Sequence, residues 1–79
     1  MILHIYADSK RRTRCRSCGA DITFARLTGS GKLHPFNGQI VATLTEVLNG
    51  RLVEHVNTDI TSSHFATCPD AKDWKRHGQ

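Results

Sequence analysis

The sequence predicts a small α+β domain made of β-hairpins and one short C-terminal helix, folded as a single unit over residues 1–79. Its 79 residues are 38% hydrophobic and 6% aromatic, which suits one domain with a marginal core. Two stretches place β-rich runs on either side of turn residues, and a proline opens a polar stretch near the C-terminus. A chain of this size usually needs a source of stability beyond its hydrophobic core, so we also expect a bound metal.

The N-terminal part is predicted to be a strand followed by an exposed basic arm. The β-branched and aromatic content of "ILHIYA" is typical of a short strand. Residues 9–16 then crowd cations around the first cysteines, and we expect a solvated arm or loop there. The next segment, "DITFARLTGSGKLHPF", alternates Ile22, Phe24 and Arg26 before a Gly-rich turn at 28–32, which predicts a first hairpin.

A second hairpin is predicted in "IVATLTEVLNGRLVEHV". The Asn-Gly pair at 49–50 separates two β-rich runs and suits the positive φ angles of a two-residue type I′ turn. In that register the facing pairs are Val47 with Leu52 and Leu44 with His55. Apolar residues fall on both faces of this hairpin, so the pattern leaves open which face is buried.

The C-terminal part is predicted to hold a helical turn and then a separate helix. "TDITSS" is typical of a linker, and Ser62 or Ser63 can cap a short turn over residues 64–67. Pro69 disfavours helical geometry at Cys68 but suits the first turn of a new helix. "PDAKDWKRH" is therefore the predicted C-terminal helix.

The spacing of cysteine and histidine predicts one metal site with four protein ligands. Cys15 and Cys18 flank a two-residue gap before Gly19, so both thiolates can reach one ion from a tight turn. His64 and Cys68 lie about one helical turn apart and supply two more ligands. This Cys₃His set uses every cysteine of the chain, and we expect it to bind one structural Zn²⁺.

Other assignments of these residues stay open at this point. The first cysteine pair could be redox-active, although that hypothesis expects a βαβ context and leaves Cys68 unexplained. Cys68 could instead be a small core residue and His64 a surface one. Within the zinc hypothesis, His34 or His77 could replace His64 as the fourth ligand.

Two stretches, "CRSCGADITFARLTGSGKLHPF" and "SSHFATCPDAKDWK", resemble a group of small, mostly uncharacterised zinc-ribbon-like proteins of bacteria and their phages. The likeness covers residues 15–36 and 62–75, about half of the chain, and its motif Ser-His-Phe-Ala-Thr-Cys-Pro is specific. The resemblance implies a zinc-ribbon-like or zinc-finger-like fold with four ligands, Cys15, Cys18, His64 and Cys68. It implies no particular activity, and the basic arm and the second hairpin lie outside the shared pattern.

Positive charge is a property of the N-terminal part of the chain. Residues 1–32 hold seven Lys or Arg against two acidic residues, a net +5, whereas residues 33–79 hold four against five, a net −1. We therefore predict that the arm contacts the phosphates of DNA or RNA. The predicted contact residues are Lys10, Arg11, Arg12, Arg14 and Arg16, extended by Arg26 and Lys32. Phe24 and Trp74 either stack on unpaired bases or belong to the core.

A protein-binding adaptor is the alternative functional hypothesis. A phage or mobile-element product of this kind could dock on an acidic host protein, or add a strand to a partner's sheet. Catalysis is not expected, because four protein ligands leave no open position on the zinc. A His-Asn-His-like nuclease that uses His34-Pro35 is a remote third hypothesis, since a second cysteine pair and a neighbouring carboxylate are missing.

The sequence also predicts a cytoplasmic protein with neither a membrane nor a small molecule as its partner. No apolar run approaches about 18 residues, so no membrane-spanning helix is expected. "MILHIYAD" lacks the basic start and the apolar core of a secretory signal. Three cysteines cannot all pair with one another, which favours a reducing compartment.

Overall fold

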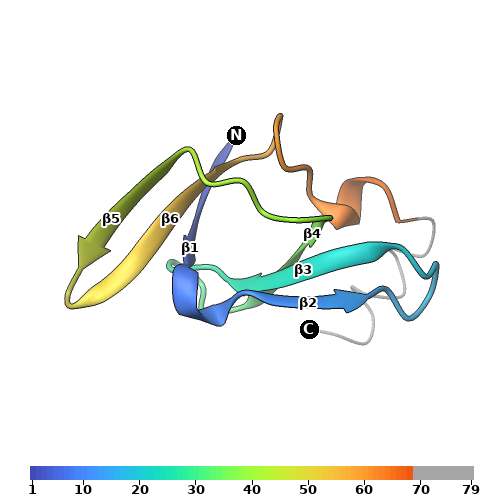
Figure 1. Cartoon of the computed structure of the whole chain (residues 1–79), viewed down its shortest axis with the longest axis horizontal. Helices are drawn as coiled ribbons and strands as arrows, with labels where there is room; N and C mark the ends of the chain where they lie inside the picture. The colour runs from blue at the N-terminus through green and yellow to red at the C-terminus, as the bar shows by residue number, and fades with distance from the viewer. Residues whose placement is uncertain (69–79) are drawn as a thin grey trace.

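The computed structural model describes residues 1–68, which form two three-stranded antiparallel sheets (Figure 1). The first sheet has the order β1-β6-β5, from β1 (Ile2–Tyr6), β6 (Arg51–Asn57) and β5 (Leu44–Leu48). The second has the order β2-β3-β4, from β2 (Arg11–Arg14), β3 (Asp21–Arg26) and β4 (Leu33–Asn37). The described residues add two short 3₁₀ turns, η1 (Ala7–Ser9) and η2 (His64–Ala66).

The predicted α+β class is wrong, because the described residues make an all-β fold. The turn expected over residues 64–67 does form, but it is a 3₁₀ turn of three residues and too short to make a helical layer. Ser63 occupies its N-cap position without a capping bond from its side chain. The predicted C-terminal helix, "PDAKDWKRH", lies outside the described residues, as do Trp74 and His77.

Half of the basic segment at 9–16 is a strand, β2, where we predicted an exposed arm or loop. β2 pairs antiparallel with β3, with Arg11 opposite Phe24 and Arg14 opposite Asp21. It lies at the edge of its sheet, and all four of its residues are exposed. Pairing at an edge needs only the backbone N–H and C=O groups on one side, so such a strand requires no apolar alternation in its sequence.

Both predicted hairpins and the predicted N-terminal strand are confirmed. β3 and β4 pair across the Gly-rich turn, and β1 pairs with β6. β5 and β6 pair in the register that the Asn-Gly turn predicts. Asn49 has a φ of 51° and Gly50 a φ of 79°, which places both residues in the left-handed region that a type I′ turn requires.

Apolar side chains are buried in two separate places. The main core lies between the sheets, which also meet at an isolated bridge between Ile5 and Leu27; its buried residues are Ile5, Ala25, Phe36, Ile40 and Val56. A second cluster consists of Cys15, Ile22 and Cys68, with the half-buried Phe24 packed against it. The smaller cluster therefore surrounds two of the predicted metal ligands.

Candidate metal centre

Cys15 and Cys18 lie on the loop that connects β2 to β3. The backbone amide of Cys15 donates to the carbonyl of Ala20, and the amide of Gly19 donates to the carbonyl of Cys15, both at 2.9 Å. Gly19 has a φ of 76°, a left-handed conformation that glycine adopts without a steric cost. The two bonds hold the thiol-bearing loop at the end of the β2–β3 ladder.

His64 and Cys68 reach the same place because η2 lies against the end of β4. The amide of Asn37 donates to the carbonyl of Ser62 at 2.9 Å, and Ser63 forms an isolated bridge with β4. The amide of Cys68 then donates to the carbonyl of His64 at 2.8 Å and closes the turn. Residues that are 46 to 53 positions apart in the sequence thus come together across the second sheet.

The four predicted ligands form one group that is able to hold a metal ion. The ligand atoms of Cys15, Cys18, His64 and Cys68 all lie within 4.8 Å of one another. Cys15 Sγ lies 3.8 Å from Cys68 Sγ, and Cys18 Sγ lies 3.5 Å from His64 Nε2. Tetrahedral zinc, with bonds of about 2.3 Å to sulfur and about 2.05 Å to nitrogen, separates its ligands by about 3.8 Å and about 3.6 Å. Both distances fit the edges of such a site.

The positions of the cysteines, His64 and His34 also bear on the alternative hypotheses for these residues. The 3.8 Å between the sulfur atoms of Cys15 and Cys68 is far longer than a disulfide bond. His64 is 2% exposed and Cys68 7%, so neither is a surface residue. His34 stands apart from the group, with its Nε2 2.8 Å from Ser63 Oγ.

Asn37 holds the His64 ring in the orientation that a metal needs. His64 Nδ1 lies 2.6 Å from Asn37 Oδ1, so the ring donates through Nδ1 and presents Nε2 to the sulfur atoms. Asn37 Nδ2 in turn donates to Ser62 Oγ at 2.8 Å and to Thr67 Oγ1 at 2.9 Å. Metal-binding histidines usually have such a partner on the second ring nitrogen.

The sulfur of Cys15 is electrostatically prepared to act as a ligand. Burial of this thiol raises its pKa, but hydrogen bonds from the backbone amides of Cys18 and Ser17 and from the side chains of His64 and Cys18 outweigh that effect. Together they lower the pKa of Cys15 to about 6. The thiolate, which is the form that binds metal, is therefore favoured at neutral pH.

The search for related proteins adds nothing to this description. No family model, curated protein or solved structure matches the chain. The resemblance to zinc-ribbon-like proteins of bacteria and phages thus stays a prediction. No helix within residues 1–68 is long and apolar enough to cross a membrane.

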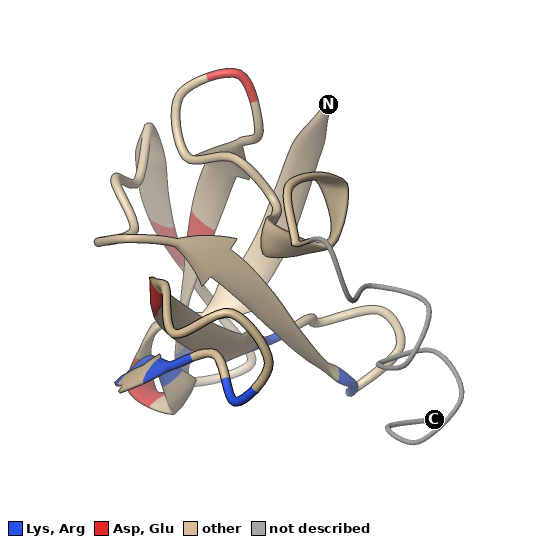
Figure 2. Cartoon of the chain, turned by 90° about the vertical axis from the view of Figure 1, so that its right-hand side faces the viewer, with Lys and Arg blue, Asp and Glu red and all other residues tan. Residues whose placement is uncertain are grey.

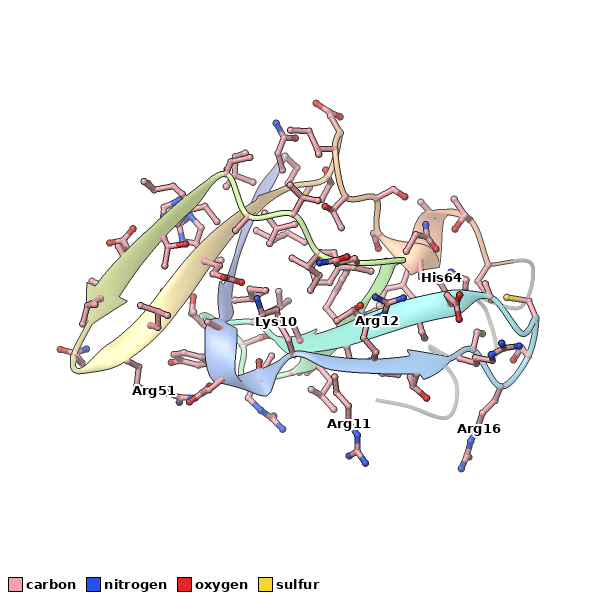
Figure 3. The ribbon with its side chains drawn as sticks, viewed as in Figure 1. Lys10, Arg11, Arg12, Arg16, Arg51 and His64 are labelled. Carbon is pink, nitrogen blue, oxygen red and sulfur yellow. The ribbon has the colours of Figure 1, made fainter. Side chains whose placement is uncertain are left out.

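The cations predicted to contact nucleic acid lie on two sides of β2. Figure 3 shows Lys10 and Arg12 pointing to one side of the strand and Arg11 and Arg16 pointing to the other. For Arg11 and Arg12 this division follows from the strand itself, since successive side chains of a strand alternate between its faces, whereas Arg16 lies on the loop after β2. The basic segment is therefore a strand edge with cations on both sides, and not a single flat patch.

Two of these cations have acidic partners. Lys10 Nζ lies 2.7 Å from Glu54 Oε1, although this ion pair lacks the alignment of a hydrogen bond. Arg14 Nε lies 3.7 Å from Asp21 Oδ1. By contrast, residues 1–68 offer no acidic partner to the three cations Arg11, Arg12 and Arg16.

Shallow hollows flank β2 on both sides. One, of about 300 Å³, is lined by Lys10, Arg11, Arg12, Thr23, Gln39 and Ile40. The other, of about 470 Å³, is lined by Ser9, Arg11, Thr13, Phe24, Arg26 and Leu33.

The remaining predicted contact residues lie on or near the β3–β4 hairpin. Arg26 donates to the carbonyl of Gly31, and Lys32 is exposed in the same turn. The packing of Phe24 against the cysteine cluster supports its assignment to the core.

Asn37 is the residue of the centre that the sequence reading missed. It stands in "HPFNGQ", where Asn before Gly resembles turn chemistry and carries no mark of a metal site. Its role depends on β4 lying next to η2, and no local pattern encodes that contact.

Proposed function

We propose that this protein is a small zinc-dependent nucleic-acid-binding protein in which the metal holds the β2–β3 loop and β2 contacts phosphates. One observation carries the proposal: β2 ends at Arg14, and the next residue is Cys15, a member of the group that could hold a metal ion. The strand that bears the exposed cations is thus joined directly to the loop that a metal would fasten. The sheet edge would be held in place before a nucleic acid binds.

Zinc is the ion that the donor set favours. Three thiolates and one imidazole are a donor set typical of structural zinc sites, which have no open position for water or substrate. The purified protein is expected to contain one zinc per chain in native mass spectrometry, and Cys68→Ser is expected to lose it. A folded wild-type monomer without metal would contradict this part of the proposal.

The charge distribution supports phosphate binding at β2. In Figure 2 the visible Lys and Arg segments gather toward one end of the molecule, where some acidic segments lie among them, and a loop with an acidic segment lies at the opposite end. Arg11, Arg12 and Arg16 on or next to β2 have no acidic partner in the described residues, and neither do Arg26 and Lys32. Each phosphate contact releases about one condensed counterion, so binding should weaken steeply as salt rises.

The test is a salt series on single substitutions. Arg11→Gln and Arg12→Gln are each expected to weaken binding to a mixed-sequence DNA or RNA oligonucleotide and to lower the salt slope by about 1. Arg51→Gln is the matched control, because Arg51 belongs to the other sheet and is engaged elsewhere. Its guanidinium lies 2.9 Å from Asp8 Oδ1 and 3.6 Å from the centre of the Tyr6 ring.

The nucleic-acid proposal fails under either of two results. The first is that wild-type protein with its full zinc content binds no oligonucleotide at low salt. The second is that Arg51→Gln weakens binding as much as the β2 substitutions do. Metal content is measured for every variant, so that loss of binding is not confused with loss of fold.

A protein-binding adaptor is the second candidate, and a different surface favours it. β5 is an edge strand of the first sheet, and Figure 1 shows the β5–β6 hairpin extending away from the second sheet. Four of its apolar side chains are 49% to 66% exposed: Leu44, Val47, Leu48 and Leu52. An exposed apolar strand edge can pair with a partner's strand. A nuclease-resistant partner that Val47→Lys releases in a pull-down would favour this function.

A further inference from the structure

Two histidines and a glutamate lie together on one face of the first sheet, apart from the Cys₃His centre. They come from three neighbouring strands: His4 from β1, His55 from β6 and Glu46 from β5. His4 stands directly opposite His55 in the register, and their ring centroids are 4.2 Å apart with a tilt of 36°. Leu44 also faces His55, which places Glu46, two residues further along β5, on the same face.

Glu46 orients the His55 ring. Its carboxylate is hydrogen-bonded to Nε2 of His55, so Nδ1 is the nitrogen that remains available to a ligand. A carboxylate behind an imidazole is the usual arrangement in metal sites, because it fixes the tautomer and the ring orientation. Within residues 1–68, no hydrogen bond engages His55 Nδ1 or either ring nitrogen of His4.

Both rings have some access to solvent. His4 is an exposed residue, and the His55 side chain is 17% exposed. A metal ion could therefore reach this face without opening the fold. The three groups do not form a compact set of three donors, since the Cys₃His centre is the one such group in the described residues. The chemistry on this face is that of a two-histidine site with an outer carboxylate.

We propose that His4 and His55 form a second metal site, for a divalent transition-metal ion such as Zn²⁺, with Glu46 as the residue that positions His55. Imidazole nitrogen suits these borderline ions. Two protein nitrogens leave the other coordination positions to water, so the site should bind more weakly than the Cys₃His centre. Such an ion would link β1 to β6. This site does not depend on nucleic-acid binding.

The experiment uses protein whose Cys₃His centre is already filled with zinc, as checked by native mass spectrometry. Further Zn²⁺ is added in a calorimetric titration, and the imidazole signals are followed by NMR. We expect a second saturable event of one ion per chain that shifts the signals of His4 and His55. His4→Phe keeps a ring against His55 and is expected to weaken this event at least about tenfold, and Glu46→Gln by about 10- to 100-fold.

His34→Phe is the matched control, because His34 is packed on the second sheet and should leave the second event unchanged. His4 is exposed, so His4→Phe is expected to fold like the wild type, which circular dichroism verifies. The proposal is overturned if no second saturable event occurs up to millimolar Zn²⁺. It is equally overturned if His4→Phe binds the second ion as tightly as the wild type does.

Discussion

At the level of single residues, Asn37 connects the His64 ring of the candidate metal centre to the turn around it. Its Oδ1 accepts from His64 Nδ1, and its Nδ2 donates to the hydroxyls of Ser62 and Thr67. The amide thus ties the ligand to the two ends of the turn that carries it. Without this contact, the His64 ring would be free to change its tautomer or rotate away from the sulfur atoms.

Asn37→Ala is expected to weaken zinc binding by about 10- to 100-fold, because outer partners of metal ligands typically contribute this much. The measurement is competition with a chelator of known zinc affinity. Gln39→Ala, an exposed position two residues further on, is the control and should leave zinc affinity unchanged. Equal zinc affinity in Asn37→Ala and wild type would show that the orientation of His64 does not depend on this amide.

His34 is predicted to make stability depend on pH. Its ring packs against Phe36 and Phe65, and burial lowers its pKa from the ordinary value of 6.5. The unfolded chain therefore takes up this proton first as the pH falls. The contribution of His34 to stability is complete above about pH 6.5 and is lost as the pH drops from there through the folded pKa.

An NMR titration of the His34 imidazole tests this shift directly. The midpoint is expected below 6.5 in the folded protein and near 6.5 in the urea-unfolded chain. A folded-state midpoint at or above 6.5 would contradict the prediction and would mean that the packing of the ring does not disfavour its charged form.

At the level of elements, the β5–β6 hairpin depends on the backbone conformation of its turn. Asn49 and Gly50 both have positive φ, and this combination matches the twist of the two strands. The turn sets the register, and with it the side of the sheet on which His55 and Glu46 meet. The two-residue Asn-Gly turn thus controls how Glu46 and His55 are placed relative to His4, although the three residues belong to three different strands.

Gly50→Ala is expected to lower the free energy of unfolding by about 1 kcal/mol, because a Cβ is disfavoured at its φ of 79°. Gly29→Ala is the matched control. Gly29 lies outside the left-handed region, and an added Cβ there would meet no atom within 4 Å. Urea unfolding of the metal-bound proteins measures both changes. Similar losses in the two variants would argue against a special role for the turn.

At the level of the whole molecule, we expect the fold to depend on a metal at the Cys₃His group, because the apolar cores are small. Five buried residues make the main core, and cysteine sulfur supplies much of the second cluster. The centre joins the β2–β3 loop to η2, so it links segments near the two ends of the described chain. Without an ion, two buried thiols, the exposed thiol of Cys18 and a buried imidazole would lack a shared partner.

Removal of the metal is expected to abolish cooperative unfolding. Structural zinc contributes about 10 to 16 kcal/mol in small domains, which equals or exceeds the usual stability of about 5 to 15 kcal/mol. Thermal melts followed by circular dichroism, before and after treatment with a strong chelator, make the comparison, and added zinc should restore the transition. An unchanged melting temperature in verified metal-free protein would show that the sheets are stable alone.

Local patterns predicted the hairpins and the four ligands but not the fold class. The Asn-Gly pair and the Gly-rich turn determine their own registers, and the metal-ligand spacings at 15–18 and 64–68 are visible in the chain. β2 escaped prediction because an edge strand with both faces in water leaves no hydrophobic period. The α+β class was wrong because the described residues form two antiparallel sheets with no helix beyond two 3₁₀ turns, and the helix expected at "PDAKDWKRH" lies outside them.

By itself, the sequence determined which residues can bind metal, where the chain turns and where the positive charge lies, because spacing, turn chemistry and composition are local properties. Only the tertiary structure decided that Asn37 supports His64, that Lys10 is paired with Glu54, and that His4 meets His55. Each of these contacts joins residues 27 to 51 positions apart, and strand pairing and sheet packing bring them together. No local period in a sequence records contacts over such distances.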